Sequence, residues 1–120
     1  SSHRYVKKNN SIDEIEIIRN KKAITDYFKA EDILILNQVH GIDVIDADNN
    51  SIIIPEADGS ITTRKNLVLA VQTADCVPVL LASGDGKIIG AAHTGWKGVI
   101  NGIIHNIVNK MFNKNLKTKI

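Results

Sequence analysis

The chain has 120 residues, of which 43% are hydrophobic and 23% are charged, and its formal net charge is +2. This length suits one domain with a single modest core, and scattered lysines with so small a net charge argue against a nucleic-acid partner. One cysteine excludes an internal disulfide and indicates a reducing compartment. No apolar run approaches the ~20 residues of a membrane span, so we expect a cytoplasmic protein without a membrane partner.

The first half of the chain predicts one helix followed by short strands. Ser11 and Glu14 have capping-box spacing, and apolar residues then recur at helical steps, which predicts a helix over 12–29. Apolar runs predict strands at 33–36, 42–46 and 52–54. Turn-forming residues at 48–51 and 56–60 predict loops between the later elements.

The second half predicts a strand-rich segment and a long amphipathic helix. Strands are expected at 67–72, 77–82 and 87–92, with a hairpin turn at 83–86. Apolar residues at three- and four-residue steps between Trp96 and Phe112 predict a helix of about 16 residues, weakened locally by Gly98 and Gly102. The order of elements predicts a single α+β or mixed α/β domain over 1–120.

Three candidate metal ligands, His40, Cys76 and His93, each follow an apolar run and precede a polar or glycine-containing turn. Two imidazoles and a thiolate suit zinc and leave the fourth tetrahedral position open, as in catalytic sites. Their wide spacing is unlike that of a zinc finger, so spacing alone supports a metal weakly. The alternatives are a buried cysteine that fills the core and histidines that serve as hydrogen-bonded turn residues.

A second candidate site is the tight turn and helix start that follow His93. Gly95, Trp96 and Lys97 lie where free backbone N–H groups and the helix dipole can bind an anion such as phosphate. Lys97 is unfavourable against the dipole in the first turn unless an anion sits there. The alternative is a lysine that is simply solvated. Asp75 is a candidate acid only because it adjoins Cys76, and aspartates in the positions of Asp75 and Asp58 are most often turn formers.

Four segments together resemble a known family. QVHG at 38–41, ADGSIT at 57–62, TADCVP at 73–78 and AAHTGWKG at 91–98 occur in the order and with the spacing of the YfiH/DUF152 family. That family is also called laccase-domain or polyphenol-oxidase-like, and is described as purine nucleoside phosphorylase. Four ordered motifs make the resemblance specific.

The resemblance implies a YfiH-like sandwich of mixed sheet with flanking helices. It implies a zinc ion held by His40, Cys76 and His93, and phosphorolysis of adenosine, inosine, guanosine and S-methyl-5′-thioadenosine, with adenosine deamination as a second activity. Purine nucleoside and phosphate are then the expected small-molecule partners. We take Cys76, His93 and Asp75 as candidate catalytic residues and Gly95, Trp96 and Lys97 as the candidate phosphate contacts.

Three features leave other functions open. The family often has Ala and Arg where this chain has Thr94 and Lys97, and lysine lacks the bidentate fork of arginine. Family members run to roughly twice this length, so we expect a domain truncated at its C-terminus. The alternative functions are therefore those of an inactive truncated remnant or of half of a split protein that binds zinc. The expected protein partner is a second copy of the chain or the missing second half. Older descriptions of the family imply copper-dependent phenol oxidation, but four histidines and one cysteine are too few for a multi-copper site.

Overall fold

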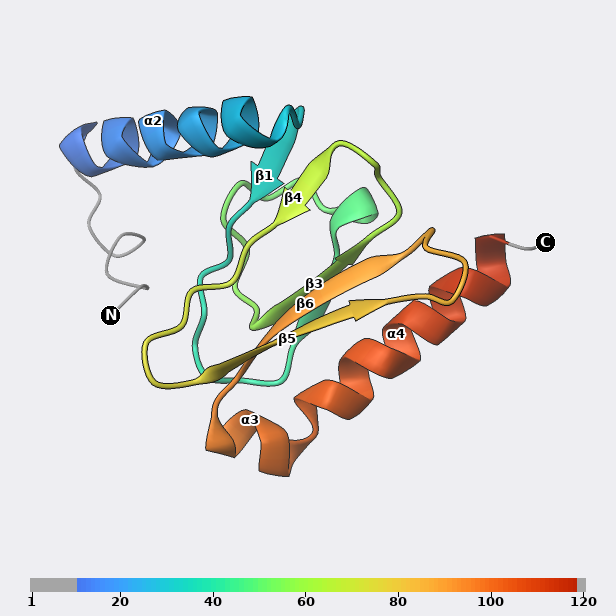
Figure 1. Cartoon of the computed structure of the whole chain (residues 1–120). Helices are drawn as coiled ribbons and strands as arrows, with labels where there is room; N and C mark the ends of the chain where they lie inside the picture. Colours follow the sequence, from blue (N-terminus) through green and yellow to red (C-terminus); the bar gives the residue numbers. More distant parts are fainter. Residues whose placement is uncertain (1–10, 119–120) are drawn as a thin grey trace.

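The computed structural model describes residues 11–118, with the side chains of 19–97, 99 and 101–115 (Figure 1). Its elements in chain order are α2 (Ser11–Phe28), β1 (Asp32–Leu34), β2 (Val44–Asp46), the 3-10 helix η1 (Ala47–Asn49), β3 (Gly59–Thr62), β4 (Leu67–Leu69), β5 (Val77–Ala82), β6 (Ile89–Thr94), α3 (Trp96–Asn101) and α4 (Ile103–Thr118). The mixed α/β class is thus confirmed. No helix within the described range is long and apolar enough to cross a membrane.

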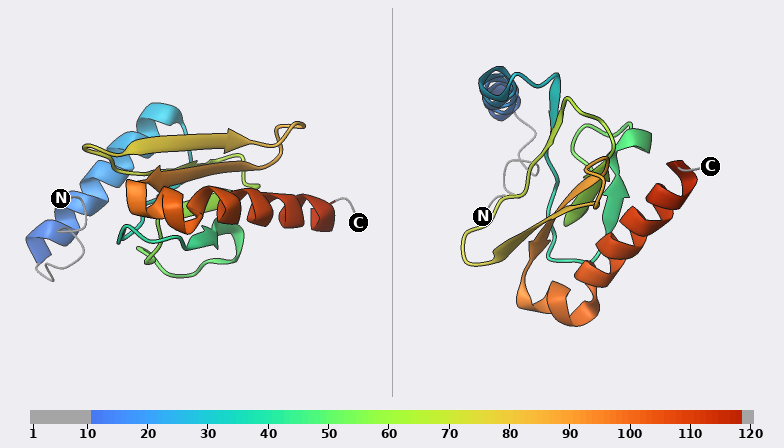
Figure 2. Two further views of the ribbon diagram at one scale, coloured as in Figure 1. Left: turned by 90° about the horizontal axis from the view of Figure 1, so that it is seen from below. Right: turned by 45° about the vertical axis from the view of Figure 1, so that its right-hand side comes forward.

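A four-stranded mixed sheet forms the centre of the molecule, in the order β2-β3-β6-β5. β2 and β3 are parallel, whereas β6 runs antiparallel to both β3 and β5. α4 packs on one face of the sheet, against β6, β3 and β2, and both η1 and β4 contact β3. A separate parallel pair, β1 and β4, lies beside the sheet, and α2 packs on β1 (Figure 2).

The main core lies between the sheet and α4. Its fully or nearly fully buried members are Ile61, Ile88, Ala92, Ile103, Ile107 and Met111. Gly90 of β6 lets the helix approach, since a Cβ there would lie 3.1 Å from both Ile107 Cδ1 and Met111 Sδ and 3.3 Å from Ile61 Cγ2. The helix therefore sits close to the strand that carries His93.

Replacing Gly90 with valine should lower the free energy of unfolding by about 1–3 kcal/mol, because three extra carbons enter a filled core. Gly84 is the matched control, because a Cβ there meets nothing within 4 Å, and Gly84→Val should change stability by less than about 0.5 kcal/mol. Urea unfolding followed by circular dichroism measures both. Equal effects of the two substitutions would contradict the close approach of α4 to β6.

A polar cluster ties η1 and α4 to the end of β3. Asp48 accepts hydrogen bonds of 2.6 Å from the hydroxyls of both Thr62 and Thr63, and Lys114 of α4 lies 3.1 Å from Asp48 and 2.6 Å from Asp46. Burial by itself raises the pKa of Asp48, but the hydrogen bonds from the threonines and Lys114 outweigh it and hold the pKa at about 2. The carboxylate is thus stabilised in its charged form by the folded state.

Because the folded pKa of Asp48 lies below its ordinary value of 3.8, its contribution to stability is present above about pH 4 and is lost as the pH falls towards 2. The contribution should be about 1–2 kcal/mol. Urea unfolding of the native chain and of Asp48→Asn across this range measures it: the difference between the two should shrink on acidification. Asp26→Asn removes a surface ion pair and should show no comparable pH-dependent difference.

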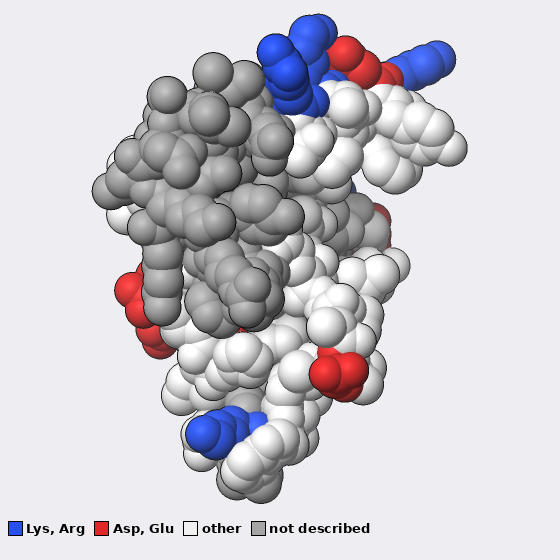
Figure 3. Space-filling model, turned by 90° about the vertical axis from the view of Figure 1, so that its left-hand side faces the viewer, with Lys and Arg blue, Asp and Glu red and all other residues white. Residues whose placement is uncertain are grey.

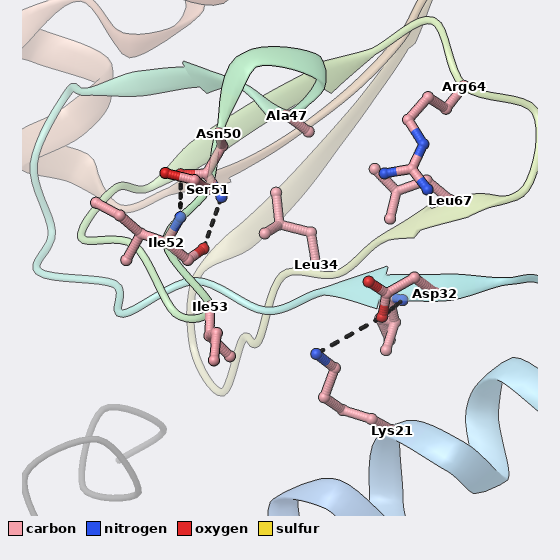
Figure 4. A pocket seen from close by; sticks show the side chains of 11 residues that line it. Lys21, Asp32, Leu34, Ala47, Asn50, Ser51, Ile52, Ile53, Arg64 and Leu67 are labelled. Atoms are coloured by element: carbon pink, nitrogen blue, oxygen red, sulfur yellow. Dashed lines mark hydrogen bonds and ion pairs between the residues drawn. The ribbon is translucent and has the colours of Figure 1, made fainter.

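Two predicted elements of the first half are wrong. Residues 52–54 do not form a strand, because the side chain of Asn50 hydrogen-bonds the backbone of Ile52. Its amide group donates to Ile52 O at 2.6 Å, and its Oδ1 accepts from Ile52 N at 3.3 Å (Figure 4). Ile52 and Ile53 are left exposed. Conversely, the loop predicted at 56–60 runs into β3, a central strand whose four residues are all buried. The search for apolar runs does not detect β3, because most of its side chains are small or polar.

The predicted C-terminal helix is also corrected. Gly102 adopts a φ of +102° and divides it into α3 and α4, and α4 continues to Thr118, beyond the expected end. The strand at 77–82 and the helix over 12–29 are confirmed, although the capping-box side chains of Ser11 and Glu14 lie outside the described residues. β4 stops at Leu69, and β6 begins two residues later than expected, so that His93 lies within the strand.

Candidate metal centre

The three predicted ligands converge at one end of the four-stranded sheet. His40 lies in the loop after β1, Cys76 in the turn before β5, and His93 in β6. One ligand atom from each lies within 4.8 Å of the others, and the two imidazole rings meet edge to face with centroids 4.9 Å apart. The apolar runs before His40 and Cys76 do not continue as strands up to these residues, and only His93 lies in a strand. The three side chains nevertheless converge.

Asp58 organises the loop that carries His40. Its side chain is fully buried and accepts hydrogen bonds of 3.0 Å from the backbone N–H groups of Val39, His40 and Gly41. Three successive N–H groups around one carboxylate form an anion-binding nest. They also account for the positive φ of His40, +60°, which is uncommon for a residue with a side chain.

The same aspartate holds the second imidazole. His93 Nδ1 lies 2.8 Å from Asp58 Oδ2, with both side chains buried, and His93 N–H donates to the backbone oxygen of Asp58 at 2.7 Å. With the Nδ1 proton donated to the carboxylate, the Nε2 lone pair is available to a metal. A carboxylate behind a histidine is the usual support of a metal ligand, because it fixes the tautomer and the ring orientation.

A glycine leaves the space between the ligands open. A Cβ at Gly95 would lie 3.4 Å from Cys76 Sγ and 3.6 Å from His40 Cδ2, so a larger side chain would project into the cluster. The Thr94 hydroxyl donates to Val77 O and joins the end of β6 to the start of β5. This bond fixes the turn of Cys76 relative to His93.

Gln38 secures the segment that leads to Cys76. Its side-chain amide is buried, donates to Gln72 O at 2.8 Å and accepts from Gln72 N at 2.7 Å. The loop of His40 and the loop of Cys76 are thereby held side by side. Each loop is irregular, so these side-chain bonds replace the strand pairing that would otherwise fix its position.

The donor set fits a metal ion. Two imidazole nitrogens and one thiol sulfur are ligands that zinc accepts, with a fourth position left for water or substrate. His93 is immobilised by Asp58, whereas His40 is exposed and Cys76 half-buried, so rotation of these two side chains can close the cluster around an ion. The arrangement is therefore a candidate metal site of the His/Cys/His type.

The other predicted site residues, Asp75, Trp96 and Lys97, are exposed and are not part of the His40, Cys76 and His93 cluster. Asp75 is exposed, and within the described part of the chain its side chain forms no hydrogen bond or ion pair. Trp96 and Lys97 are exposed too, with the ammonium group 5.6 Å from the indole centroid. α3 has only six residues, so its dipole attracts an anion more weakly than the dipole of the predicted long helix would.

Asp58 and Gln38 are the residues that sequence reasoning missed as supports of the site. Both belong to the family motifs, but Asp58 resembles a turn former because glycine follows it. One signal in the sequence could have identified Asp58: its carboxylate lies within ADGSIT at 57–62, one of the four ordered family motifs. Only the folded chain shows that this carboxylate contacts two ligand residues at once.

Comparison with known families gives a match over nearly the whole chain. Residues 6–119 match the family described as multi-copper polyphenol oxidoreductase laccase. Two crystal structures are similar: YfiH of Bacillus licheniformis, with a TM-score of 0.71 and 29% identity over 82% of this chain and 41% of that one, and Neisseria meningitidis protein NMB0706 of DUF152, with a TM-score of 0.69 and 32% identity over 75% of this chain and 37% of that one.

Curated relatives carry a different functional name. A purine nucleoside phosphorylase of Rickettsia conorii is 72% identical over 120 residues, which are 100% of this chain and 50% of the relative. One of Rickettsia prowazekii is 66% identical with the same coverage, so the chain spans about half the length of these relatives. The match over 6–119 and the four ordered motifs show that the chain belongs to the multi-copper polyphenol oxidoreductase laccase family, which includes YfiH and DUF152.

Proposed function

We propose that this chain binds zinc through His40, Cys76 and His93 and supplies the metal centre of a purine nucleoside phosphorylase. The observation that carries the proposal is the buried Asp58, which holds the loop of His40 and the ring of His93 together. The names of relatives at 72% and 66% identity support the reaction class. Adenosine, inosine, guanosine and S-methyl-5′-thioadenosine are the proposed substrates, with adenosine deamination as a second activity.

The residues of the chain have distinct parts in this proposal. Asp58 keeps the Nδ1 proton of His93 in place, and Gly95 keeps the space beside Cys76 free of side-chain atoms. A bound zinc ion supplies Lewis-acid chemistry or lowers the pKa of a coordinated water to about 7. Lys97 offers an exposed positive charge to phosphate, with Gly95 and Trp96 beside it. Asp75 is proposed as the proton donor to the leaving base because it adjoins Cys76.

The test is to incubate the zinc-loaded chain with inosine and phosphate and to quantify hypoxanthine and ribose 1-phosphate by chromatography. Equal amounts of the two products that require phosphate, with none formed by Cys76→Ala, would support phosphorolysis. Hypoxanthine without ribose 1-phosphate would indicate hydrolysis instead. Zinc bound at one ion per chain with no product would contradict the proposal for this chain alone.

A zinc-binding domain without activity of its own is the second candidate. The observation that favours it is that the chain spans 50% of the length of its Rickettsia relatives, so residues that complete a substrate pocket can lie in the part that it does not span. The same incubation separates the two candidates. Zinc content of one per chain with no phosphorolysis selects the binding domain.

The copper oxidase suggested by the family description fits the ligand set of this chain poorly. The chain has four histidines, one cysteine and one methionine. Met111 is 8% exposed and packs in the core between α4 and the sheet, so it is not placed as the weak axial ligand of a blue-copper site. Oxidation of a phenolic dye by copper-loaded chain, lost in Cys76→Ala, would reverse this preference.

A further inference from the structure

The loop that carries His40 contacts both of the segments that supply the other two ligands. Its backbone N–H groups donate to Asp58, which also holds the ring of His93. On its other side, the amide of Gln38 contacts the segment that leads to Cys76. One side of the loop is thus tied to a histidine and the other side to the cysteine.

Gln38 bonds to this segment as a neighbouring strand would. Its side chain is 2% exposed, its Nε2 donates to Gln72 O at 2.8 Å, and its Oε1 accepts from Gln72 N at 2.7 Å. Exchange of both bonds with a single residue is the pattern of a hydrogen-bonded pair in an antiparallel ladder. Gln72 contributes only its backbone to this pair, and its own side chain is exposed.

The segment between β4 and β5 has few other attachments. Ala70 N–H donates to Leu34 O just after β4, and β5 begins at Val77. Between them Thr73 and Asp75 are exposed, and within the described part of the chain their side chains form no hydrogen bond or ion pair. Figure 3 shows the side of the molecule to which this segment projects in Figure 1, and below the charged groups at its top the described surface carries only isolated charges. The bonds to Gln38 are therefore the main attachment of the segment.

The pairing of β5 fixes the residue after Cys76 but not the direction of the cysteine side chain. Val77 pairs with Thr94, and the Thr94 hydroxyl also donates to Val77 O. The direction in which the chain enters the strand is set by the segment that precedes it. Because Cys76 is only half-buried, release of that segment would let the sulfur turn away from the histidines towards solvent.

We propose that Gln38 is a positioning residue for Cys76, whose amide determines whether a bound metal ion gains the sulfur ligand or only the two imidazoles. This inference rests on the metal centre proposed above. Residues behind a metal ligand fix its orientation and tune its affinity, and here the two supports act on different ligands: Asp58 on the histidines and Gln38 on the cysteine. Since a thiolate favours zinc over harder cations, the amide of Gln38 also contributes to the choice of metal.

The test replaces Gln38 with leucine, which has a similar volume but forms no hydrogen bond through its side chain. Cobalt(II) is the probe, because a thiolate bound to cobalt gives a charge-transfer absorption that imidazole does not, and Cys76 is the only cysteine of the chain. In Gln38→Leu this absorption per bound cobalt ion should be largely lost, and zinc affinity should fall about 10–100-fold.

Gln72→Ala is the matched control. It removes an exposed side chain and keeps the backbone groups that bond to Gln38, so it should change neither the cobalt absorption nor the zinc affinity. Gln38→Glu is a second variant for the case in which leucine does not pack at this position. It keeps an acceptor for Gln72 N–H but places a carboxylate oxygen against Gln72 O, and should also weaken sulfur ligation.

Urea unfolding of the metal-free variants measures stability separately from metal binding. A folded Gln38 variant that keeps the native absorption per bound cobalt ion overturns the proposal, whatever its stability, because Gln38 then has a structural role only. An equal loss of absorption in Gln72→Ala overturns it as well. These readouts do not depend on phosphorolysis: a native chain that binds cobalt through sulfur but releases no purine base contradicts the proposed reaction and leaves this inference intact.

Discussion

Alanine in place of His40, Cys76 or His93 will reduce bound zinc from about one ion per chain to near zero after gel filtration. Each substitution removes one of the three protein ligands. Loss of a residue that only supports a ligand lowers metal affinity ~10–100-fold, and loss of a ligand itself should lower it more. Metal analysis and competition with a chromogenic chelator measure the loss. His105→Ala is the control, since His105 is exposed on α4 and bonds to Asn109.

The two histidine variants should differ in stability without metal. His93→Ala leaves a buried carboxylate oxygen of Asp58 without the imidazole donor, and should lower the free energy of unfolding by about 2–3 kcal/mol. His40→Ala removes an exposed ring and keeps the backbone bond to Asp58, so its effect should stay below about 1 kcal/mol. Unchanged zinc content in all three ligand variants would show that the site is misassigned.

Replacing Asp58 with asparagine will weaken zinc binding about 10–100-fold although Asp58 is not itself among the three clustered ligands. Its Oδ1 accepts from Val39 N and Gly41 N, and its Oδ2 accepts from His40 N and His93 Nδ1. An amide group cannot accept at the position where NH₂ replaces oxygen, so two donors lose their partner. The metal-free protein should lose about 2–4 kcal/mol of stability.

Chelator competition and urea unfolding of the metal-free chain test the two effects separately. Asp43→Asn is the control, because Asp43 is an exposed aspartate whose backbone oxygen, not its side chain, accepts from Asp58 N. If Asp58→Asn lowers stability but leaves zinc affinity unchanged, Asp58 is a structural residue and the proposed support of His93 is wrong. If neither quantity changes, the nest does not organise the loop.

Local pattern predicts an element well where turn or capping residues bound an apolar run or a helical spacing. The run at 77–82 was predicted at its observed bounds, and the first helix to within about one residue, within the usual uncertainty of helix ends. β3 was missed because Gly59, Ser60 and Thr62 are small or polar, yet all are buried between layers. The run at 52–54 was misread because Asn50 offers the backbone of Ile52 a local partner in place of a strand.

The sequence by itself determined the mixed α/β class, the four ordered motifs and the identity of the three candidate ligands. Residue type and order along the chain carry that information. Only the tertiary structure decided that His40, Cys76 and His93 lie within 4.8 Å of one another, that Asp58 supports two of them, and that Val77 and Leu80 of β5 are exposed although they belong to an apolar run. These features depend on contacts between residues far apart in sequence, which neither hydrophobic period nor turn chemistry encodes.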